Sequence, residues 1–260
     1  MTVVAPGAAP NATEPLALDV RNLTGPALTP VLRDVSLGVP HGGVHVVLAP
    51  MHSGKSLLLR LLLGLERAER GTVSVDGLAF DAAHPDEDDL RRVRRRVGVV
   101  FDSSALVSRL TLLENVELPL VEHTAVDGPA ARDRAAELLR DAGVVRDTDR
   151  TPDELSRLDR RRAALARALA LGPAMLVIDE PGNGLDPHAA TELDDTLRSL
   201  HERFAWGLLI CTQEVRYAFR WPNAVSVLAG GRIVEQGSLE HLLNSRHAAV
   251  RRFVDRRGAA

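Results

Sequence analysis

Hydrophobic and polar positions alternate along two segments near the start of the chain, LALDVRNL (16–23) and VLRDVSLGV (31–39). A period of two places one apolar face against a core, so both segments are predicted to be half-buried strands. The next segment, VHVVLA (44–49), is apolar throughout. An unbroken apolar run of this length is typical of a strand covered on both faces, and it predicts the start of a parallel sheet.

Helical patterns alternate with further apolar runs in the rest of the chain. SLLLRLLLGLERAE (56–69) has amphipathic spacing, and the region from 111 to about 171 is predicted to be mainly helical. Further strands are expected at TVSVDG (72–77), VGVVF (97–101), MLVID (175–179), GLLIC (207–211) and AVSVLAGGRIVEQG (224–237). The alternation predicts an α/β fold with a β-rich N-terminal part and a helical insertion at about 105–170.

The two ends of the chain differ from this core. Residues 1–15 are rich in Ala, Pro, Gly and Asn and are expected to be disordered. Residues 239–260 are expected to form a C-terminal helical tail. The N-terminus has no basic region followed by a long apolar stretch, so no secretory signal is predicted. Cys211, the single cysteine, lies in an apolar run and is expected to be a buried thiol in a reducing cytoplasm.

The overall charge gives no support for a nucleic-acid partner. The formal net charge is −3, which offers no electrostatic argument for binding nucleic acid. The basic run RRVRRR (91–96) follows the acidic run DEDD (86–89), an order that compensates a helix dipole. A charged helix face is therefore favoured over a nucleic-acid patch, and nucleic acid is not an expected partner.

Lys55 is the only lysine among 32 lysine and arginine residues. It lies in the loop APMHSGKS (49–56), between the apolar run 44–49 and a predicted helix. A lysine is a compact charge on a thin stem, whereas a guanidinium is too broad to fit under a loop wrapped around phosphates. Strand, loop and helix together predict a phosphate-binding loop. Its expected binding residues are Ala49, Pro50, Met51, His52, Ser53, Gly54, Lys55, Ser56 and Leu57.

The loop departs from the pattern G-x-x-x-x-G-K-[ST] at its first position, Ala49, and His52 stands where a flexible residue would be easier, so a stiffer loop is expected. The Ser56 hydroxyl is predicted to ligate Mg²⁺.

Two carboxylates, Asp179 and Glu180, follow the apolar residues at the end of the segment MLVIDE (175–180). Because neighbours on a strand point to opposite sides, Asp179 is predicted to hold the Mg²⁺ shell and Glu180 to face the attacking water.

These motifs resemble the ATP-binding subunits of ABC transporters over about residues 17–257. The most specific piece is LSRLDRRRAALARALALGPAMLVIDEPGNGLDP (155–187), which resembles a signature segment, a Walker B strand and a D-loop. ENVELPLVEHT (114–124) and the tail AAVRRFVD (248–255) look most like the ATPases of Mla-type systems, which transport phospholipids with Mce-domain proteins. The resemblance implies a P-loop NTPase core of the ABC type at 16–238, with ATP and Mg²⁺ as cofactors.

The resemblance also implies roles for residues outside the phosphate loop. Ser156 and Arg157 of the signature segment and Asp186 of the D-loop would meet nucleotide. Asp102 stands where the family has a glutamine that senses Mg²⁺, and Gln213 stands at the switch histidine. Asp102 is expected to contact nucleotide and metal, although with a different geometry. An amide at Gln213 can hydrogen-bond a phosphate but cannot carry a proton.

The signature segment LSRLD lacks both glycines of the family pattern. Arg157 and Leu158 restore bulk, and Asp159 adds a negative charge where a γ-phosphate bound by a second subunit would approach. Arg157 either pairs with that phosphate or obstructs it, and obstruction is favoured. The parts that bind MgATP are retained, together with Glu180, whereas those that complete a closed dimer are altered.

The sequence therefore predicts an ATP-binding subunit with weak hydrolysis that drives a membrane permease, with lipid transport as the finer hypothesis. Its expected partners are an integral membrane permease, a second ATP-binding subunit (identical or not) and Mce-domain proteins. Its expected location is cytoplasmic, peripheral on the inner face of the cell membrane through its partner. The main alternative is a nucleotide-gated structural or regulatory subunit with little or no hydrolysis. A soluble ABC protein without a transporter is disfavoured, because such proteins commonly carry two cassettes.

Overall fold

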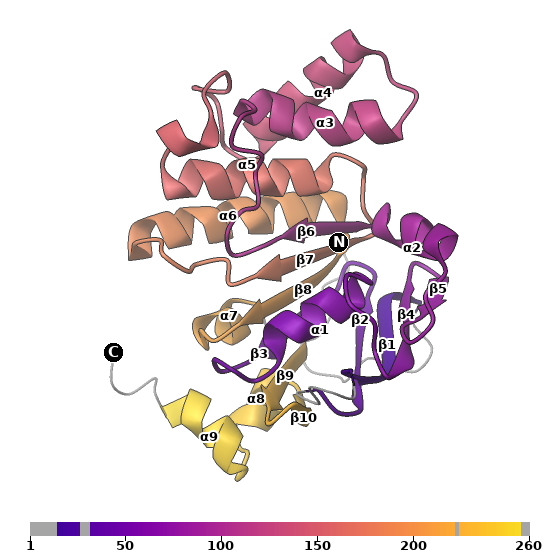
Figure 1. Ribbon diagram of the computed structural model, residues 1–260. Coiled ribbons are helices and arrows are strands. Elements are labelled where there is room, and N and C mark those ends of the chain that lie inside the picture. Colours follow the sequence, from indigo (N-terminus) through magenta and orange to yellow (C-terminus); the bar gives the residue numbers. More distant parts are fainter. Residues whose placement is uncertain (1–14, 27–31, 222–223, 256–260) are drawn as a thin grey trace. The chain divides into compact units, whose positions relative to one another are not determined.

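The computed structural model describes residues 15–26, 32–221 and 224–255. The chain divides into two compact units, Met1–Arg94 with Gly207–Ala260, and Arg95–Trp206. Figure 1 labels the elements of both. The predicted disorder of residues 1–15 falls, except for Pro15, outside the described residues. The helical insertion predicted at about 105–170 lies within the second unit, which also contains two strands and a further helix.

The first unit contains an antiparallel sheet in the order β2 (Val35–Pro40), β1 (Leu16–Thr24), β4 (Arg70–Val75) and β5 (Leu78–Asp81). Its alternating sequence places Val35, Leu37 and Val39 in the core, at most 4% exposed. β4 and β5 join through Asp76-Gly77, and both residues have positive φ (51° and 77°). This is the turn chemistry that a two-residue hairpin requires. The β-rich N-terminal part predicted from the sequence is confirmed.

The same unit contains a second group of strands around β3 (Val44–Leu48). β3 is parallel to β8 (Gly207–Thr212) and β9 (Ala224–Ala229), and β9 forms a hairpin with β10 (Arg232–Gly237). All five residues of β3 are buried, as the unbroken apolar run predicts. Five helices belong to the described part of this unit: α1 (Lys55–Leu62), α2 (Glu87–Arg94), α7 (Arg216–Arg220), α8 (Leu239–Leu243) and α9 (Ala248–Val254).

The first helix is shorter than its sequence pattern predicts. α1 ends at Leu62, and Gly64 follows in a left-handed conformation with φ 61°. A Cβ on Gly64 would lie within 2.2 Å of the Leu90 side chain. Close packing and backbone conformation both require glycine there, so the helix stops before its apolar pattern does. In α2, Arg91 pairs with Asp88 and Arg92 with Asp89, which confirms the predicted charged helix face.

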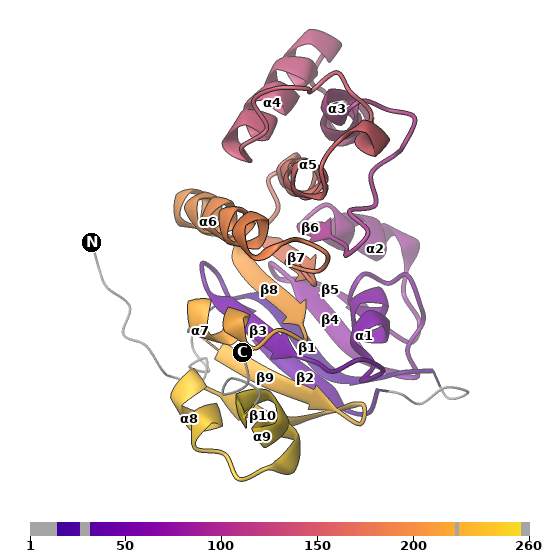
Figure 2. The ribbon, with the colours of Figure 1, turned by 90° about the vertical axis from the view of Figure 1, so that its left-hand side faces the viewer.

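The second unit contains the parallel strands β6 (Val97–Val100) and β7 (Met175–Asp179). Its helices are α3 (Leu112–His123), α4 (Gly128–Asp141), the 3₁₀ helix η1 (Pro152–Glu154), α5 (Arg157–Leu169) and α6 (Pro187–Phe204). In Figure 2, α5 lies between the pair α3/α4 and α6. A Cβ on Gly98 of β6 would lie 2.4 Å from the Ala168 carbonyl oxygen, so the absence of a side chain at Gly98 permits α5 to approach this strand.

Across the described residues, no helix is both long and apolar enough to span a bilayer.

Candidate functional site

The loop after β3 begins against β8 and turns sharply. The Ala49 N–H donates to the Thr212 carbonyl at 2.8 Å, and the Ser53 N–H donates to the Pro50 carbonyl at 3.2 Å. His52 has φ 62° and Gly54 has φ 101°. A left-handed histidine costs backbone strain, which agrees with the stiff loop expected at this position.

The loop ends at the N-terminus of α1, which offers an anion a favourable site. Gly54 caps the helix without a side chain, and the first turn contains no acidic residue. The unpaired N–H groups and the positive end of the helix dipole therefore face any group held by the loop. Lys55 is half-buried, Ser56 is exposed, and Leu57 is packed in the core, so only its backbone can contribute to binding.

Ser53 provides a test of fit. Its side chain is 5% exposed, and its buried Oγ has no hydrogen-bond partner within the described chain. Buried hydroxyls are normally paired, so an unpaired one beside a helix N-terminus fits a loop made to close around a polar group. A phosphate chain has the charge and size that this loop accommodates. Ser56 Oγ could reach a metal ion held by such a chain.

Gln213 lies beside the start of this loop, because Leu48, the last residue of β3, pairs with Thr212, the last residue of β8. Gln213 and the loop residues line a cavity of about 450 Å³. The other walls are the β9–β10 turn and α9, which contributes Arg252 and Phe253. Arg252 is a cation beside the loop that the sequence analysis did not single out. Nothing local in the sequence could have placed this tail residue there.

The carboxylates predicted for metal binding and hydrolysis belong to the second unit. Asp179 ends β7 and is half-buried, whereas Glu180 is 6% exposed and has φ 46°. Glu180 therefore has a left-handed backbone conformation at the start of the turn Glu180–Asn183, in which the Asn183 N–H donates to the Glu180 carbonyl at 3.1 Å. The argument that both carboxylates alternate along one strand is wrong, because the strand ends at Asp179. The direction of the Glu180 side chain follows from its own left-handed backbone.

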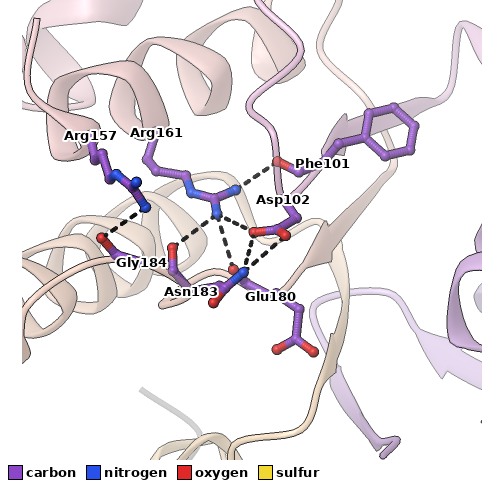
Figure 3. Close-up of polar contacts among 7 residues, drawn as sticks. All are labelled: Phe101, Asp102, Arg157, Arg161, Glu180, Asn183 and Gly184. Carbon is purple, nitrogen blue, oxygen red and sulfur yellow. Dashed lines mark hydrogen bonds and ion pairs between the residues drawn. The ribbon is translucent and has the colours of Figure 1, made fainter. Parts of the chain in front are cut away.

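Asp102 is held by Arg161 and Asn183 (Figure 3). Arg161 Nη2 donates to Asp102 Oδ1 at 2.7 Å, and Asn183 Nδ2 donates to both carboxylate oxygens at 3.0 Å. Arg161 also donates to the backbone carbonyls of Phe101 at 2.7 Å and Glu180 at 3.4 Å. We refer to Asp102, Arg161 and Asn183 as the Arg161 cluster. Its carboxylate is engaged within the chain, an arrangement that differs from the metal contact expected for Asp102.

The sequence analysis named Asp102 but missed Arg161 and Asn183. Arg161 is 4% exposed and is the only buried arginine in the described chain. It is the middle member of three consecutive arginines, so composition alone does not mark it. Its four-residue spacing from Arg157 places both side chains on one face of α5, but this spacing does not show which face is buried, so the sequence gives no signal that marks Arg161.

The start of α5 carries its own anion. Ser156 caps the helix, accepting a hydrogen bond from the Asp159 N–H at 3.1 Å and donating to Asp159 Oδ2 at 2.6 Å. The Asp159 carboxylate therefore lies in the first turn, where the helix dipole favours negative charge. Arg157 Nη1 donates to the Gly184 carbonyl at 3.4 Å. The N-termini of α1 and α5 thus differ, because only α5 contains an acidic residue in its first turn.

Asp186 caps α6. Its Oδ1 accepts hydrogen bonds from the His188 N–H at 2.9 Å and the Ala189 N–H at 3.0 Å. These backbone donors, Ala189 first, lower the pKa of Asp186 below its usual value. The described structure therefore gives this carboxylate a helix-capping role.

The predicted residues thus form two groups, each within one unit. The phosphate loop and Gln213 share one cavity in the first unit. In the second unit, the Arg161 cluster connects Asp102 to the backbone at Glu180, and Arg157 reaches the same segment at Gly184. Ser156 and Asp186 are engaged as helix caps.

Comparisons with known proteins identify relatives that share one family. A family model described as "ABC transporter" matches residues 32–183. "Probable ribonucleotide transport ATP-binding protein mkl" of Mycobacterium leprae (strain TN) is 35% identical over 243 residues, which cover 93% of this chain and 70% of the relative. The protein of the same name from Mycobacterium tuberculosis (strain ATCC 25618 / H37Rv) is 35% identical, covering 87% of this chain and 63% of the relative.

A further relative is "Methionine import ATP-binding protein MetN 1" of Rhodococcus jostii (strain RHA1), 35% identical over 90% of this chain and 70% of the relative. The chain thus spans 63% to 70% of the length of these three relatives.

Two solved structures resemble the fold of this chain. The dimeric ATP-binding cassette MJ0796 bound to ADP and Pi has a TM-score of 0.76 and 29% identity, covering 85% of this chain and 98% of the other. The structure of cbiO1 from Clostridium perfringens, described as part of the ABC transporter complex cbiONQ, has a TM-score of 0.79 over 95% of this chain and 98% of the other. Its 23% identity supports the fold alone.

Proposed function

Because this chain belongs to the ABC transporter family and is an ATP-binding subunit of that kind, we propose that it binds MgATP at Ala49–Ser56 and uses slow hydrolysis to drive a membrane permease. The predicted α/β fold of the ABC ATPase type is confirmed. The observation that carries the nucleotide site is the strained loop after β3, which leads into a helix N-terminus free of acidic residues.

Each residue then has a chemical task. Lys55 would neutralise charge on the β- and γ-phosphates, and Ser56 and Asp179 are the residues that would hold Mg²⁺, which would supply further charge neutralisation when bound. Glu180 orients the water and accepts its proton as the water oxygen bonds to the γ-phosphorus and ADP leaves. Glu180 is 6% exposed, so bulk solvent has little access to it.

The test is calorimetric titration of ATP with Mg²⁺. Lys55→Ala should weaken binding by at least about tenfold, which corresponds to about 1.4 kcal/mol. Lys55→Arg should also bind poorly, because the guanidinium is too broad for the loop. Arg60→Ala is the matched control, since it removes a cation from the exposed side of the same helix, where Arg60 pairs with Glu66 at 2.9 Å. Equal affinities for wild type and Lys55→Ala would contradict the proposal.

The proposed slow rate rests on the start of α5. In a closed dimer this helix N-terminus would face the γ-phosphate bound by the second subunit, and Asp159 already provides the negative charge that its dipole favours. A second anion would be repelled. The same observation supports the alternative function, a nucleotide-gated subunit that scarcely hydrolyses ATP. Measured turnover with the assembled partner distinguishes the two.

We propose that the permease contacts α3. Leu118 and Val121 lie three residues apart on this helix and are 40% and 49% exposed. Apolar side chains grouped on one helix face are suited to a protein partner. Leu118→Ser with Val121→Ser should reduce recovery of the permease in affinity purification from membranes. Val145→Ser is the control, because Val145 is 71% exposed in the same unit but outside α3.

A phospholipid cargo and Mce-domain partners are our finer proposal. It rests on the resemblance of residues 114–124 and 248–255 to Mla-type ATPases. The names of the relatives refer to ribonucleotide transport and to methionine import, which are different cargoes. Mass spectrometry of the complex purified from native membranes tests the point. Co-purified Mce-domain proteins would support lipid transport, whereas a soluble amino-acid-binding protein in their place would contradict it.

A further inference from the structure

We propose that Arg161 is a positioning residue for hydrolysis, and that Asp102 neutralises Arg161 instead of binding Mg²⁺. The proposal rests on the proposed function, because it takes Glu180 as the residue that activates water. It follows from the Arg161 cluster shown in Figure 3, all of whose members belong to the second unit.

Arg161 requires a counter-charge where it lies. Its side chain is 4% exposed, and burial of an isolated guanidinium is costly. Its two terminal nitrogens donate to one carboxylate, that of Asp102, and to the carbonyls of Phe101, Glu180 and Asn183. The carbonyls satisfy N–H groups but carry no net charge. Asp102 therefore supplies the anion that lets Arg161 remain buried and charged.

This engagement conflicts with a metal role for Asp102. Both of its oxygens accept hydrogen bonds from Asn183, and Oδ1 also accepts from Arg161 at 2.7 Å. A divalent cation coordinated by the same carboxylate would lie close to the Arg161 guanidinium, and like charges at short range repel each other. The metal would also have to displace hydrogen bonds that are already made.

The second half of the proposal concerns the backbone that carries Glu180. Its φ of 46° is an unfavourable conformation for a non-glycine residue, and such conformations persist only where the surroundings hold them. The Glu180 carbonyl accepts hydrogen bonds from the Asn183 N–H at 3.1 Å and from Arg161 Nη2 at 3.4 Å. Arg161 thus fixes the turn that directs the catalytic carboxylate, and small displacements of such a group cost large factors in rate.

Two other arginines of α5 extend this arrangement. Arg157 reaches the Gly184 carbonyl, and Arg167 donates to the carbonyls of Ala105 at 2.7 Å and Ser104 at 3.2 Å. One helix therefore holds the segment after β6 and the segment after β7 through their backbones. Of these three arginines, Arg161 is the one that contacts both segments. Its removal should therefore loosen the turn at Glu180 more than removal of either of the others.

The first experiment measures metal affinity directly. Mn²⁺ replaces Mg²⁺ in the wild-type complex with a non-hydrolysable ATP analogue, and its affinity is determined by electron paramagnetic resonance. Asp102→Asn, which keeps the shape of the side chain, should leave the Mn²⁺ affinity within about twofold of wild type. Asp179→Asn should lower it by at least about tenfold, as expected for the loss of a metal contact. A loss in Asp102→Asn as large as that in Asp179→Asn would overturn the proposal.

The second experiment separates positioning from folding. Arg161→Gln should lower kcat by about tenfold or more, with the ATP affinity changed less than about twofold. Arg162→Gln is the matched control, because Arg162 lies on the same helix and forms a 3.0 Å ion pair with Glu192 outside the cluster. Arg161→Lys keeps the charge but cannot reach all the carbonyls, so it serves as the second variant if Arg161→Gln does not fold, and it should also turn over slowly.

Turnover in Arg161→Gln equal to that in Arg162→Gln would overturn the positioning role. Failure of the wild type to bind MgATP would instead contradict the proposed function, and the two results are distinguishable.

Discussion

Arg161 Nη2 lies 2.7 Å from Asp102 Oδ1, which joins a buried residue of α5 to the segment that follows β6. The pair is unequal, because the Arg161 side chain is 4% exposed and the Asp102 side chain is 44% exposed. Loss of either partner should therefore have different consequences for stability and for chemistry.

Asp102→Ala should destabilise the protein, because it leaves the guanidinium buried among backbone carbonyls. Removing one partner of a fully buried pair costs about 3–5 kcal/mol, and partial exposure of Asp102 should reduce this to about 1–3 kcal/mol. Urea denaturation measures the free energy of unfolding. Asp89→Ala, which breaks the exposed 3.4 Å pair with Arg92, should cost less than about 1 kcal/mol. Equal losses in the two variants would mean that burial of Arg161 does not matter.

Glu180→Gln should abolish most hydrolysis while preserving nucleotide binding. The amide has the shape of the carboxylate but cannot accept the proton from water, and losing such a base typically costs about 10²–10⁴-fold in rate. Steady-state turnover and calorimetry check the two parts. Glu137→Gln, on the exposed face of α4, is the control. Unchanged turnover in Glu180→Gln would show that another group activates the water.

Repair of the altered dimer residues should accelerate hydrolysis. Arg157→Gly, Leu158→Gly and Asp159→Gln remove bulk and negative charge at the start of α5, and Gln213→His restores a group that can carry a proton. Together they should raise turnover at least about tenfold, about 1.4 kcal/mol of transition-state stabilisation. The same changes in a Glu180→Gln background should give no increase. A repaired protein that binds MgATP and dimerises but is no faster would refute this account of the signature segment.

The stability should fall in mild acid because of His45. This residue is fully buried in β3, with Nδ1 2.9 Å from the Gly38 carbonyl and Nε2 2.8 Å from Ser226 Oγ, and burial lowers its pKa below the usual value of 6.5. Below about pH 6.5 the unfolded chain binds a proton that the folded chain does not, so this residue reduces stability as the pH falls towards the lowered value.

The test is chemical denaturation at pH 7.5 and pH 5.5. The drop in the free energy of unfolding should be smaller in His45→Gln than in wild type, with a limit of about 1.4 kcal/mol per pH unit for one group. His84→Gln, at an 87% exposed side chain, should behave as wild type does. An identical pH dependence in His45→Gln would exclude this residue as a source of acid sensitivity.

The sequence by itself determined the elements whose signals are local. The strand of β3, the loop to Lys55 and the strand of β7 could be predicted because each is one contiguous segment with its own pattern. The apolar pattern places the end of α1 too late because it continues past Gly64, although a glycine is a common helix stop, and the structure adds that a Cβ at this position would meet Leu90. The direction of Glu180 could not be predicted, since a single left-handed residue after a strand leaves no mark in a pattern of period two.

Only the tertiary structure distinguished Arg161 from its two neighbours in the run Arg160–Arg162. The three have the same side chain and the same helical context, yet Arg161 alone is buried. Its partners lie 59 or 60 residues earlier in the chain, at Asp102 and Phe101, and 19 or 22 residues later, at Glu180 and Asn183. Which face of α5 turns inward is decided by packing against those distant segments, and a buried charge becomes tolerable only where that packing also provides its counter-charge.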